Sequence, residues 1–476
     1  MPTAASLILP LIGSPETYRP DRPHLKTEGA VSVHPEGPDG WKARLHLYVR
    51  RESTWVRREN LGAIERGGDL ALAATPARPG DRAAQTLTGT LRLRSQAGET
   101  LYEARIAPVL LASSLDPVRE VWVVRNALTE RFAREIARLA PRCKGRPRVR
   151  FVRNDVRPED VWMQDTVEFG TVATPEADGK ARQRTAALLG LRAKHDMGLT
   201  CGPLDSLVRK VLERDRADIV PLAIGEPRAG ARWIDWYGNL EVTPPVRNHP
   251  FGRILTGQQR GLTLHPDLLA FLEAQKYQWP PLYLDVGWLT IGHVDELIQF
   301  VPAPGPPGFR VLMPSPRLAV ELLEGLVRQG HGNRKVFSGR KGETTVTQLL
   351  DEAGRTTETD AIEKALAETR RQLRTELGID ERQIVSLPVL FRNGLAVIPN
   401  GVNGLVLGSD YLVPAPNGPV IEGVDVLERA IRDRLQPLGL RLRFLDIYEP
   451  YHVRAGEIHC GTNTVRIRKK VDWWTG

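Results

Sequence analysis

The stretch Tyr451–Arg466 reads YHVRAGEIHCGTNTVR and places Cys460 between a histidine and Gly461-Thr462-Asn463. The alternating run from Glu457 to Cys460 predicts a strand that ends in a tight turn. Such a position suits a nucleophilic thiol, which needs a rigid edge and nearby backbone donors, without apolar burial that would raise its pKa. A cysteine beside a histidine is more often structural than catalytic, so the interpretation of this stretch depends on polar residues elsewhere in the chain.

Length, composition and charge describe an ordinary globular protein. The 476 residues are enough for two domains or one large one, and the core of such a chain is sizeable. Hydrophobic residues make up 41% and charged residues 26%, which is typical of the globular class. The net charge is +9, but the densest basic cluster, Arg468-Lys469-Lys470, is short and indicates a solvated surface. We therefore expect no specific nucleic-acid partner.

The cysteines and the N-terminus indicate the compartment. Cys143, Cys201 and Cys460 are too few and too scattered for a disulfide framework, and they form no CxxC metal motif. Reduced thiols and a cytoplasmic location are therefore expected. The N-terminal MPTAASLILPLIG lacks a basic segment, and Pro10 interrupts its apolar run, so it predicts a first strand instead of a signal peptide. No apolar run approaches the length of about 18 residues that a membrane helix needs.

Residues 1–115 carry strand-like alternation with turn residues between the runs, as at 43–49, 85–93 and 102–106. Several short strands at this spacing, without a convincing helix, predict an immunoglobulin-like β-sandwich domain. No chemically informative motif occurs in this region.

Residues 116–476 alternate between strand and helix patterns, which predicts a second domain of the α/β class. Helices are expected near 128–139, 204–214, 265–276, 316–328, 358–377 and 424–435. Strands are expected near 119–124, 148–152, 283–291, 310–313, 384–387, 395–398, 405–407 and 441–446. The polar segment 340–375 predicts an exposed helical insertion.

Four polar side chains stand at the ends of apolar runs: Asp165, His293, Asp295 and Cys460. Singly, each has a structural explanation, such as a turn cap, a hydrogen-bonded histidine or a surface carboxylate. Together they suit the chemistry of a guanidinium, which stays cationic and is therefore a poor electrophile. Two carboxylates would orient it through charge-assisted hydrogen bonds, a thiolate would attack its carbon, and a histidine would move protons to the leaving ammonia and from water.

Five separated motifs, from about residue 105 to the C-terminus, resemble the catalytic domain of the protein-arginine (peptidylarginine) deiminases. They are Trp162-Met163-Gln164-Asp165, Tyr237–Pro245, Gly292–Glu296, Pro399–Gly408 and Tyr451–Asn463. The resemblance implies a pentein-type α/β-propeller with fivefold pseudosymmetry and a central active site. The family usually carries two immunoglobulin-like domains before it, and this chain holds residues for one.

The resemblance implies a role for several residues. Cys460 would be the nucleophile, forming an S-alkylthiouronium intermediate, and His293 the general acid and base. Asp165 and Asp295 would hold the guanidinium, and Trp162 would line the aliphatic part of the substrate. Arg454 matches a position beside the mouth of the site, and Arg192, in the poorly matching segment 190–199, is the candidate for the arginine that clamps the substrate backbone.

The family is activated by calcium, and the resemblance carries one catalytic-domain site. Its ligands would be the side chains of Gln164, Glu168 and Glu241 with the backbone carbonyls of Tyr237 and Leu240, an oxygen set that suits Ca²⁺. The alternative is that the two glutamates are ordinary surface carboxylates. A second family site needs an acidic residue where Thr166 stands, so we expect it to be lost and calcium dependence to be shallower than in two-site relatives.

Three functions remain open from the sequence. The first is a protein-arginine deiminase that acts on arginine in proteins or peptides, with a homodimer left open. The second is a deiminase of a small guanidine, such as free arginine or agmatine. The third is a non-catalytic interaction protein that kept the fold, although such a protein would be free to lose any of the four candidate catalytic residues.

Overall fold

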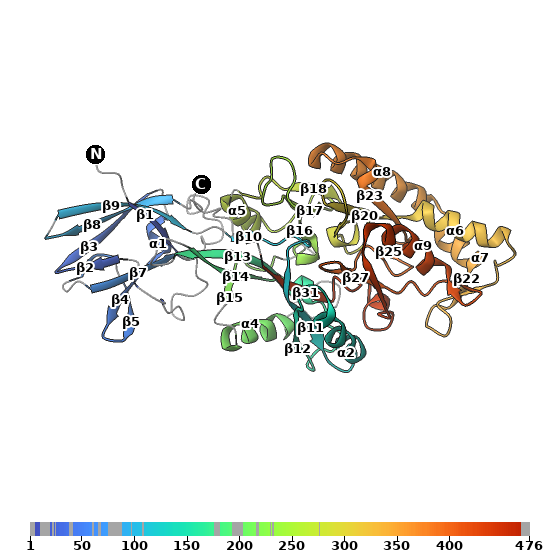
Figure 1. The fold of residues 1–476 in the computed structure, drawn as a ribbon, viewed down its shortest axis with the longest axis horizontal. Helices are drawn as coiled ribbons and strands as arrows, with labels where there is room; N and C mark the ends of the chain where they lie inside the picture. The colour runs from blue at the N-terminus through green and yellow to red at the C-terminus, as the bar shows by residue number, and fades with distance from the viewer. Residues whose placement is uncertain are drawn as a thin grey trace.

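The computed structural model describes residues 5–467 apart from 10–19, 21–22, 24, 38–40, 60, 65–67, 75–87, 97, 107–108, 176–180, 193–202, 216–218, 229, 231–232 and 276. An all-β region at the N-terminal end lies beside a larger α/β region (Figure 1). Within the described ranges, we find no helix with the length and apolar character of a membrane span.

Two sheets form the N-terminal region, one with the strand order β1-β9-β8-β3-β6 and the other with β2-β7-β4-β5. The strands are β1 (Ala5–Leu9), β2 (Leu25–Thr27), β3 (Val31–Glu36), β4 (Leu45–Arg51), β5 (Thr54–Arg58), β6 (Ala63–Ile64), β7 (Gly68–Ala74), β8 (Thr88–Ser95) and β9 (Gly98–Ile106). In β3, Val31 and Val33 are buried while His34 is exposed, which is the alternation of a half-buried strand. The strand predicted over 43–49 starts at Leu45, because Trp41–Arg44 forms a short helix, α1.

The two regions share a hydrophobic core. Leu47 and Leu72 of the first region belong to the same buried cluster as Leu110 and Leu188 of the second. Strand β10 (Val109–Leu111) pairs with β13 (Val167–Pro175), so the division predicted between residues 115 and 116 falls after a strand that belongs to the α/β region.

The α/β region repeats one strand arrangement five times. In each copy a central strand pairs antiparallel with one neighbour and parallel with another. A parallel pair requires a crossover, and a helix lies in each of these five connections. We call each copy a module.

The modules are built from the following elements. The central strands are β14 (Ala181–Leu189), β11 (Val118–Arg125), β17 (Ile254–Gln258), β20 (Phe309–Ser315) and β27 (Asp410–Pro414). Their antiparallel partners are, in the same order, β13, β31 (Thr462–Arg466), β16 (Leu240–Val242), β19 (Gln299–Pro302) and β26 (Leu405–Leu407). Their parallel partners are β15 (Ile219–Ala223), β12 (Arg148–Arg153), β18 (Leu282–Asp285), β23 (Ile384–Pro388) and β30 (Arg441–Leu445). The crossover helices are α4 (Pro203–Asp215), α2 (Glu130–Leu139), α5 (Pro266–Gln275), α6 (Pro316–Arg328) with α8 (Thr357–Leu377), and α9 (Val426–Leu435).

All six predicted helices form, with ends within two residues of the predicted ones. The expected exposed insertion at 340–375 is wrong in one respect. Helix α8 turns Ile362, Leu366 and Leu373 into the core, so only its other face is polar and exposed.

The strand predicted over 283–291 is also too long, because β18 ends at Asp285. The Asp285 carboxylate accepts a hydrogen bond from the backbone N–H of Gly287 (2.8 Å), which starts a turn. The apolar residues that follow are explained by packing, since the Trp288 ring meets Phe391 edge-on at 5.0 Å.

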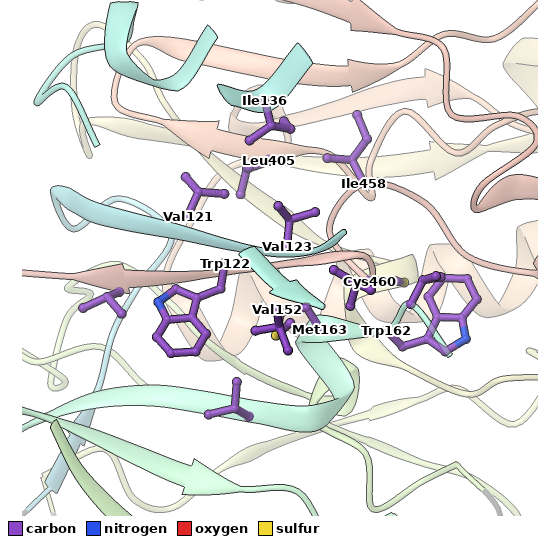
Figure 2. Close-up of a cluster of buried hydrophobic side chains, with 14 of the residues drawn as sticks. Val121, Trp122, Val123, Ile136, Val152, Trp162, Met163, Leu405, Ile458 and Cys460 are labelled. Carbon is purple, nitrogen blue, oxygen red and sulfur yellow. The ribbon is translucent and has the colours of Figure 1, made fainter. Parts of the chain in front are cut away.

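A second core cluster includes buried residues of the stretch Tyr451–Arg466. It contains Trp122 and Val123 of β11, Ile136 of α2, and Cys460. In Figure 2, Cys460 and Trp162 lie at one end of this cluster, away from Trp122. The nucleophile candidate is therefore set in a packed and rigid part of the molecule.

Candidate active site

Five segments, one from each module, bring the candidate functional residues together. Each segment precedes or begins the antiparallel strand of its module. They are Gln164-Asp165 before β13, Tyr237–Glu241 at β16, His293–Asp295 before β19, Asn400–Asn403 before β26, and His459-Cys460 before β31. Residues almost 300 positions apart thus occupy equivalent places in a repeated unit.

Cys460 lies in a turn, which corrects the predicted strand. The N–H of Gly461 donates to the carbonyl of Glu457 (3.1 Å), the Thr462 hydroxyl donates to the carbonyl of Ile458 (2.8 Å), and β31 begins only at Thr462. A four-residue alternation does not distinguish a strand from a turn with two buried positions. Burial, followed by the charges of the nearby aspartates, raises the pKa of the Cys460 thiol well above its ordinary value.

The thiol contacts two of the other segments. Its Sγ lies 3.4 Å from Oδ2 of Asp295, to which the S–H donates, and 3.3 Å from Nδ2 of Asn403. The carbonyl of Cys460 accepts a hydrogen bond from the N–H of Gln164 (3.1 Å), which joins the turn to the segment that carries Asp165.

Asp165 and His293 form the other half of the site, with Oδ1 and Nδ1 3.6 Å apart. Nε2 of His293 lies 2.8 Å from the carbonyl of Trp233 and must therefore carry a hydrogen, so a neutral ring keeps its lone pair on Nδ1. Oδ1 of Asp165 accepts from the N–H of Gly238 (3.1 Å), and a Cβ at Gly238 would lie only 2.4 Å from His293 Nδ1. Glycine is required there because the two side chains lie against its backbone.

Two polar atoms of the site are buried without a hydrogen-bond partner: Nδ1 of His293 and Oδ1 of Asp295. Burial and the charge of Asp295 raise the pKa of Asp165 to about 6. The site therefore holds an imidazole nitrogen and a carboxylate oxygen that make no hydrogen bond, although the other oxygen of Asp295, Oδ2, contacts His459.

The short 3₁₀ helix η5 (Val294–Glu296) positions His293 and Asp295. Oε1 of Glu296 accepts from the N–H of His293 (3.1 Å), which caps this helix. Gly292 before it has φ +83°, and a Cβ there would lie 2.7 Å from the Gln259 side-chain amide. Sequence reasoning could not assign these supporting roles, because they depend on segments that are distant in the chain.

His459 links the site to the predicted calcium ligands. Its Nδ1 lies 3.0 Å from Oδ2 of Asp295 and its Nε2 lies 3.3 Å from Oε1 of Glu241. Although burial disfavours the imidazolium, the charge of Glu241 and the bond to Asp295 raise the pKa of His459 to about 9. The histidine beside the nucleophile is thus a cationic bridge between two carboxylates.

The predicted calcium ligands form a compatible group of oxygens. Nε2 of Gln164 lies 2.8 Å from Oε2 of Glu168 and 3.2 Å from the carbonyl of Tyr237, so a reversed amide would direct its oxygen to the same place. Oε1 of Glu241 has no hydrogen-bond partner. Each glutamate keeps a partly exposed edge, yet the surrounding protein desolvates it, which raises the pKa of Glu168 to about 8 and of Glu241 to about 7.

These residues therefore fit a hard cation, with the ligands supplied mostly by neutral oxygens. No cluster of three or more His, Cys, Asp or Glu suited to a metal occurs in the described part of the chain. The hydroxyl of Thr166 donates to the carbonyl of Trp162 (2.7 Å), so it serves the local helix turn instead. Most of the divergent segment that would complete a second site lies outside the described residues.

The predicted substrate clamp Arg192 is placed otherwise. Its side chain has no exposed area and makes paired hydrogen bonds to Asp160 (2.8 and 2.9 Å) and to Asp205 (2.7–3.1 Å). It also lies over the Trp236 ring at 5.3 Å. A guanidinium that is fully enclosed and bound by two carboxylates is not accessible to a substrate backbone, so this geometry argues against the expected role.

The other two predicted substrate contacts differ in exposure. Trp162 is buried, and its ring lies against Gly456, where a Cβ would approach it within 2.3 Å. Arg454 is exposed in η9 (His452–Arg454) and donates to the carbonyl of Glu449. It lies two residues before Gly456, at the rim of the group.

A cavity of about 20 Å³ lies beside Cys460, with Asn403, Gly456 and Glu457 among its lining residues. This volume admits about one water molecule and not an arginine side chain. Glu457 accepts from His452 Nδ1 (2.8 Å) and from the N–H of Asn400 (3.0 Å), which ties two loops beneath the cavity.

Comparisons with known proteins identify the family of this chain. The model of the "Protein-arginine deiminase (PAD)" family matches residues 100–475, so the chain belongs to the protein-arginine deiminase family. Protein-arginine deiminase type-4 of Mus musculus is 34% identical over 389 residues, covering 78% of this chain and 56% of the relative. Type-3 of Mus musculus is 34% identical over 392 residues, with the same shares covered. The chain thus spans about half the length of these curated relatives.

Among solved structures, an agmatine deiminase of C. jejuni has a TM-score of 0.43 and 10% identity, over 76% of this chain and 98% of its own. A structure described as a putative peptidyl-arginine deiminase has a TM-score of 0.44 and 12% identity, over 76% of this chain and 99% of its own. We base the proposed function on the family match and on the geometry of this chain.

Proposed function

We propose that the chain is a protein-arginine deiminase, which converts the arginine side chain of a peptide or protein to citrulline and releases ammonia. The observation that carries the proposal is the pair of unpartnered buried atoms, Asp295 Oδ1 and His293 Nδ1, beside the buried thiol of Cys460. A buried acceptor without a donor is costly, and a guanidinium supplies both the donors and the positive charge.

The chemistry follows from the protonation states. The cationic substrate favours the thiolate, and the free lone pair of His293 Nδ1 takes the proton of the Cys460 thiol. The sulfur then gives an electron pair to the guanidinium carbon, while His293 returns the proton to a terminal nitrogen, which leaves as ammonia. Water attacks the thiouronium carbon and gives its proton to His293. The C–S bond breaks with its electron pair going to the sulfur, the remaining hydroxyl proton passes to solvent as citrulline leaves, and the thiolate is restored.

The test is ammonia and citrulline release from a blocked arginine ester, an arginine peptide, free arginine and agmatine, each with and without calcium. The Cys460→Ser variant is expected to bind the ester but to release no citrulline, because a hydroxyl lacks thiolate reactivity. A haloacetamidine probe should label Cys460. Loss of activity through labelling of Cys143 or Cys201 would refute the assignment of the nucleophile.

The second candidate is deimination of a small guanidine. The two aspartates, the histidine and the thiol would act on any guanidinium, so the same site chemistry supports this candidate. The N-terminal β-region and the family favour a peptide or protein substrate, and we retain that as the first proposal. Faster turnover of agmatine or free arginine than of the peptide would reverse this order.

We further propose one calcium site in the α/β region, with Gln164, Glu168 and Glu241 and the carbonyls of Tyr237 and Leu240 as ligands. The ion would supply positive charge that stabilises the ionised glutamates. Gln164 directly precedes Asp165, so a fixed Gln164 side chain also holds the backbone that directs Asp165. Calorimetric titration of the wild type and of the Glu168→Gln/Glu241→Gln double variant tests this site.

Three less direct expectations belong to the same proposal. The five modules would close around the site as a propeller, since each contributes one segment to it. The two N-terminal sheets would form an immunoglobulin-like domain that ends near residue 115. Because the mechanism needs a reduced thiol, and Cys143 and Cys460 are free, a cytoplasmic location remains the favoured one.

A further inference from the structure

Asn403 makes more contacts with the nucleophile than any of the predicted site residues does. Its side chain is 1% exposed. Nδ2 donates to Sγ of Cys460 (3.3 Å) and to the carbonyl of Asp295 (3.1 Å), and Oδ1 accepts from the N–H of Cys460 (3.3 Å). The Asn403 carbonyl also accepts from the N–H of His459 (3.1 Å). One asparagine therefore connects the segments that carry the nucleophile and a guanidinium-binding carboxylate.

The orientation of the Asn403 amide is set by its neighbours. A reversed amide would place its NH₂ against the N–H of Cys460 and its oxygen against the carbonyl of Asp295, and both contacts would be repulsive. The NH₂ group must therefore face Asp295 and the sulfur. The backbone supports this position, since the N–H of Asn403 donates to the carbonyl of Asn400 (3.0 Å).

The other groups near the sulfur are largely acidic. Asp295, whose Oδ2 also contacts the His459 imidazole, accepts the S–H, and Asp165 adds negative charge nearby. When the thiol loses its proton, these carboxylates repel the sulfur, whereas an N–H that already points at Sγ stabilises it. The backbone of Glu457 contributes a second favourable interaction. Asn403 supplies a side-chain N–H that donates to the sulfur of Cys460.

We propose that Asn403 is a catalytic residue that donates a hydrogen bond to Sγ of Cys460 while the sulfur carries negative charge. It does so before the sulfur gives its electron pair to the guanidinium carbon, and again when the C–S bond breaks and the sulfur recovers that pair. The same amide holds the Asp295 backbone, so the nucleophile and the carboxylate keep their separation. This role rests on the proposed deiminase function.

The experiment compares the full-length wild type with Asn403→Ala, Asn403→Asp and the matched control Asn400→Ala. Asn400 is 2% exposed, lies in the same loop, and donates to the carbonyl of Glu296 (2.8 Å) instead of to the sulfur. Three quantities are measured with calcium present. They are kcat and KM on a blocked arginine ester, the rate of Cys460 alkylation by iodoacetamide at one fixed pH, and the melting temperature.

For Asn403→Ala we expect kcat and the alkylation rate each to fall roughly 10- to 100-fold, with KM changed less than about threefold, because one hydrogen bond to a charged group is lost. Asn403→Asp keeps the acceptor for the Cys460 N–H but turns an oxygen toward the sulfur, so both rates should fall further. Asn400→Ala should lower the melting temperature by a similar amount and change the alkylation rate less than about threefold.

Equal alkylation rates in Asn403→Ala and Asn400→Ala would overturn the proposal. So would a rise in KM that accounts for the whole loss of kcat/KM, because Asn403 would then act only on substrate binding. The isosteric Asn403→Asp variant keeps the test available if the alanine variant does not fold. If no substrate yields citrulline, the deiminase proposal fails, while the alkylation rates still decide whether Asn403 stabilises the thiolate.

Discussion

Two pairs of aspartates in this molecule differ in whether they bind an arginine of the chain. Asp160 and Asp205 hold the guanidinium of Arg192 through paired hydrogen bonds of 2.7–3.1 Å, and the arginine side chain is fully enclosed. Asp165 and Asp295 have no guanidinium, and Asp295 Oδ1 is left without a partner. The first pair is a structural ion pair with an arginine, whereas the second contacts the His459 imidazole through Asp295 Oδ2 and leaves Asp295 Oδ1 without a donor.

The Asp160–Asp205 pair is structural, whereas we propose that the Asp165–Asp295 pair binds a substrate. Arg192 is the chain's own ligand for its pair, so the negative charges are compensated and the site is closed. At the second pair the neighbouring groups are the Cys460 thiol and the imidazoles of His293 and His459, and burial raises the pKa of Asp165 to about 6. Uncompensated buried charge is tolerated where a substrate supplies the compensation.

The largest expected effect is on catalysis. Asp165→Asn and Asp295→Asn should each lower kcat/KM by roughly 10³-fold or more, because the variants lose charge-assisted bonds and misalign the reacting carbon. The melting temperature should stay equal to that of the wild type or rise for Asp165→Asn, since a buried repulsion is relieved, and should fall for Asp295→Asn, which loses its ion pair with His459. Ammonia release and thermal unfolding measure the two effects. Near-normal turnover in either variant would make that aspartate structural.

At the Asp160–Asp205 pair we expect a loss of stability without a loss of activity. Asp160→Asn leaves Arg192 with one of its two carboxylates and should cost about 3 kcal/mol in the free energy of unfolding, the lower end of the range for breaking a buried ion pair. The kcat of the remaining folded enzyme should be nearly unchanged. Urea unfolding and steady-state kinetics at low temperature test this. A loss of kcat without a loss of stability would mean that the two pairs are not separate in function.

The calcium group gives an intermediate effect that depends on pH. The pKa values of Glu168 and Glu241, about 8 and about 7, exceed the ordinary glutamate value of about 4.3. The folded chain therefore retains protons that the unfolded chain releases, and the stability of the calcium-free protein should fall as pH rises from about 4 to about 8.

Calcium favours the ionised glutamates, so it should raise the melting temperature more at pH 8 than at pH 5. In the Glu168→Gln/Glu241→Gln variant the calcium effect should disappear and the fall with pH should be weaker. Differential scanning calorimetry with calcium or a chelator makes the comparison. An unchanged calcium response in the double variant would contradict the proposed ligands.

The smallest effect is expected at the rim. Arg454 is exposed and donates to the backbone carbonyl of Glu449, so Arg454→Ala should change stability by less than about 0.5 kcal/mol. We expect KM for an arginine peptide to rise a few-fold, with kcat and the KM of a small blocked ester unchanged. Equal changes for both substrates would place Arg454 in the core of the site instead of beside the peptide.

The sequence predicted the helices well because each carries its own pattern, as the exact agreement at 316–328 illustrates. It also predicted that Asp165, His293, Asp295 and Cys460 act together, because the chemistry of a guanidinium limits which residue types are useful. The structure brings these residues close to one another, and their catalytic roles stay predictions. It failed at 283–291 and at 457–460, where apolar alternation results from packing against distant segments and not from a strand. Periodicity records which side chains are buried, and it does not record what buries them.

By itself, the sequence determined which residue types could act on a guanidinium, the α/β class of the second region and the family that its motifs resemble. Only the tertiary structure decided which acceptors lack a donor, that Arg192 is enclosed by Asp160 and Asp205, and that Asn403 and His459 contact the nucleophile and its carboxylate. The physical reason lies in the repeated module. Each site segment precedes or begins an antiparallel strand, so the five meet only when the modules are assembled, and no local pattern encodes a contact between residues more than a hundred positions apart.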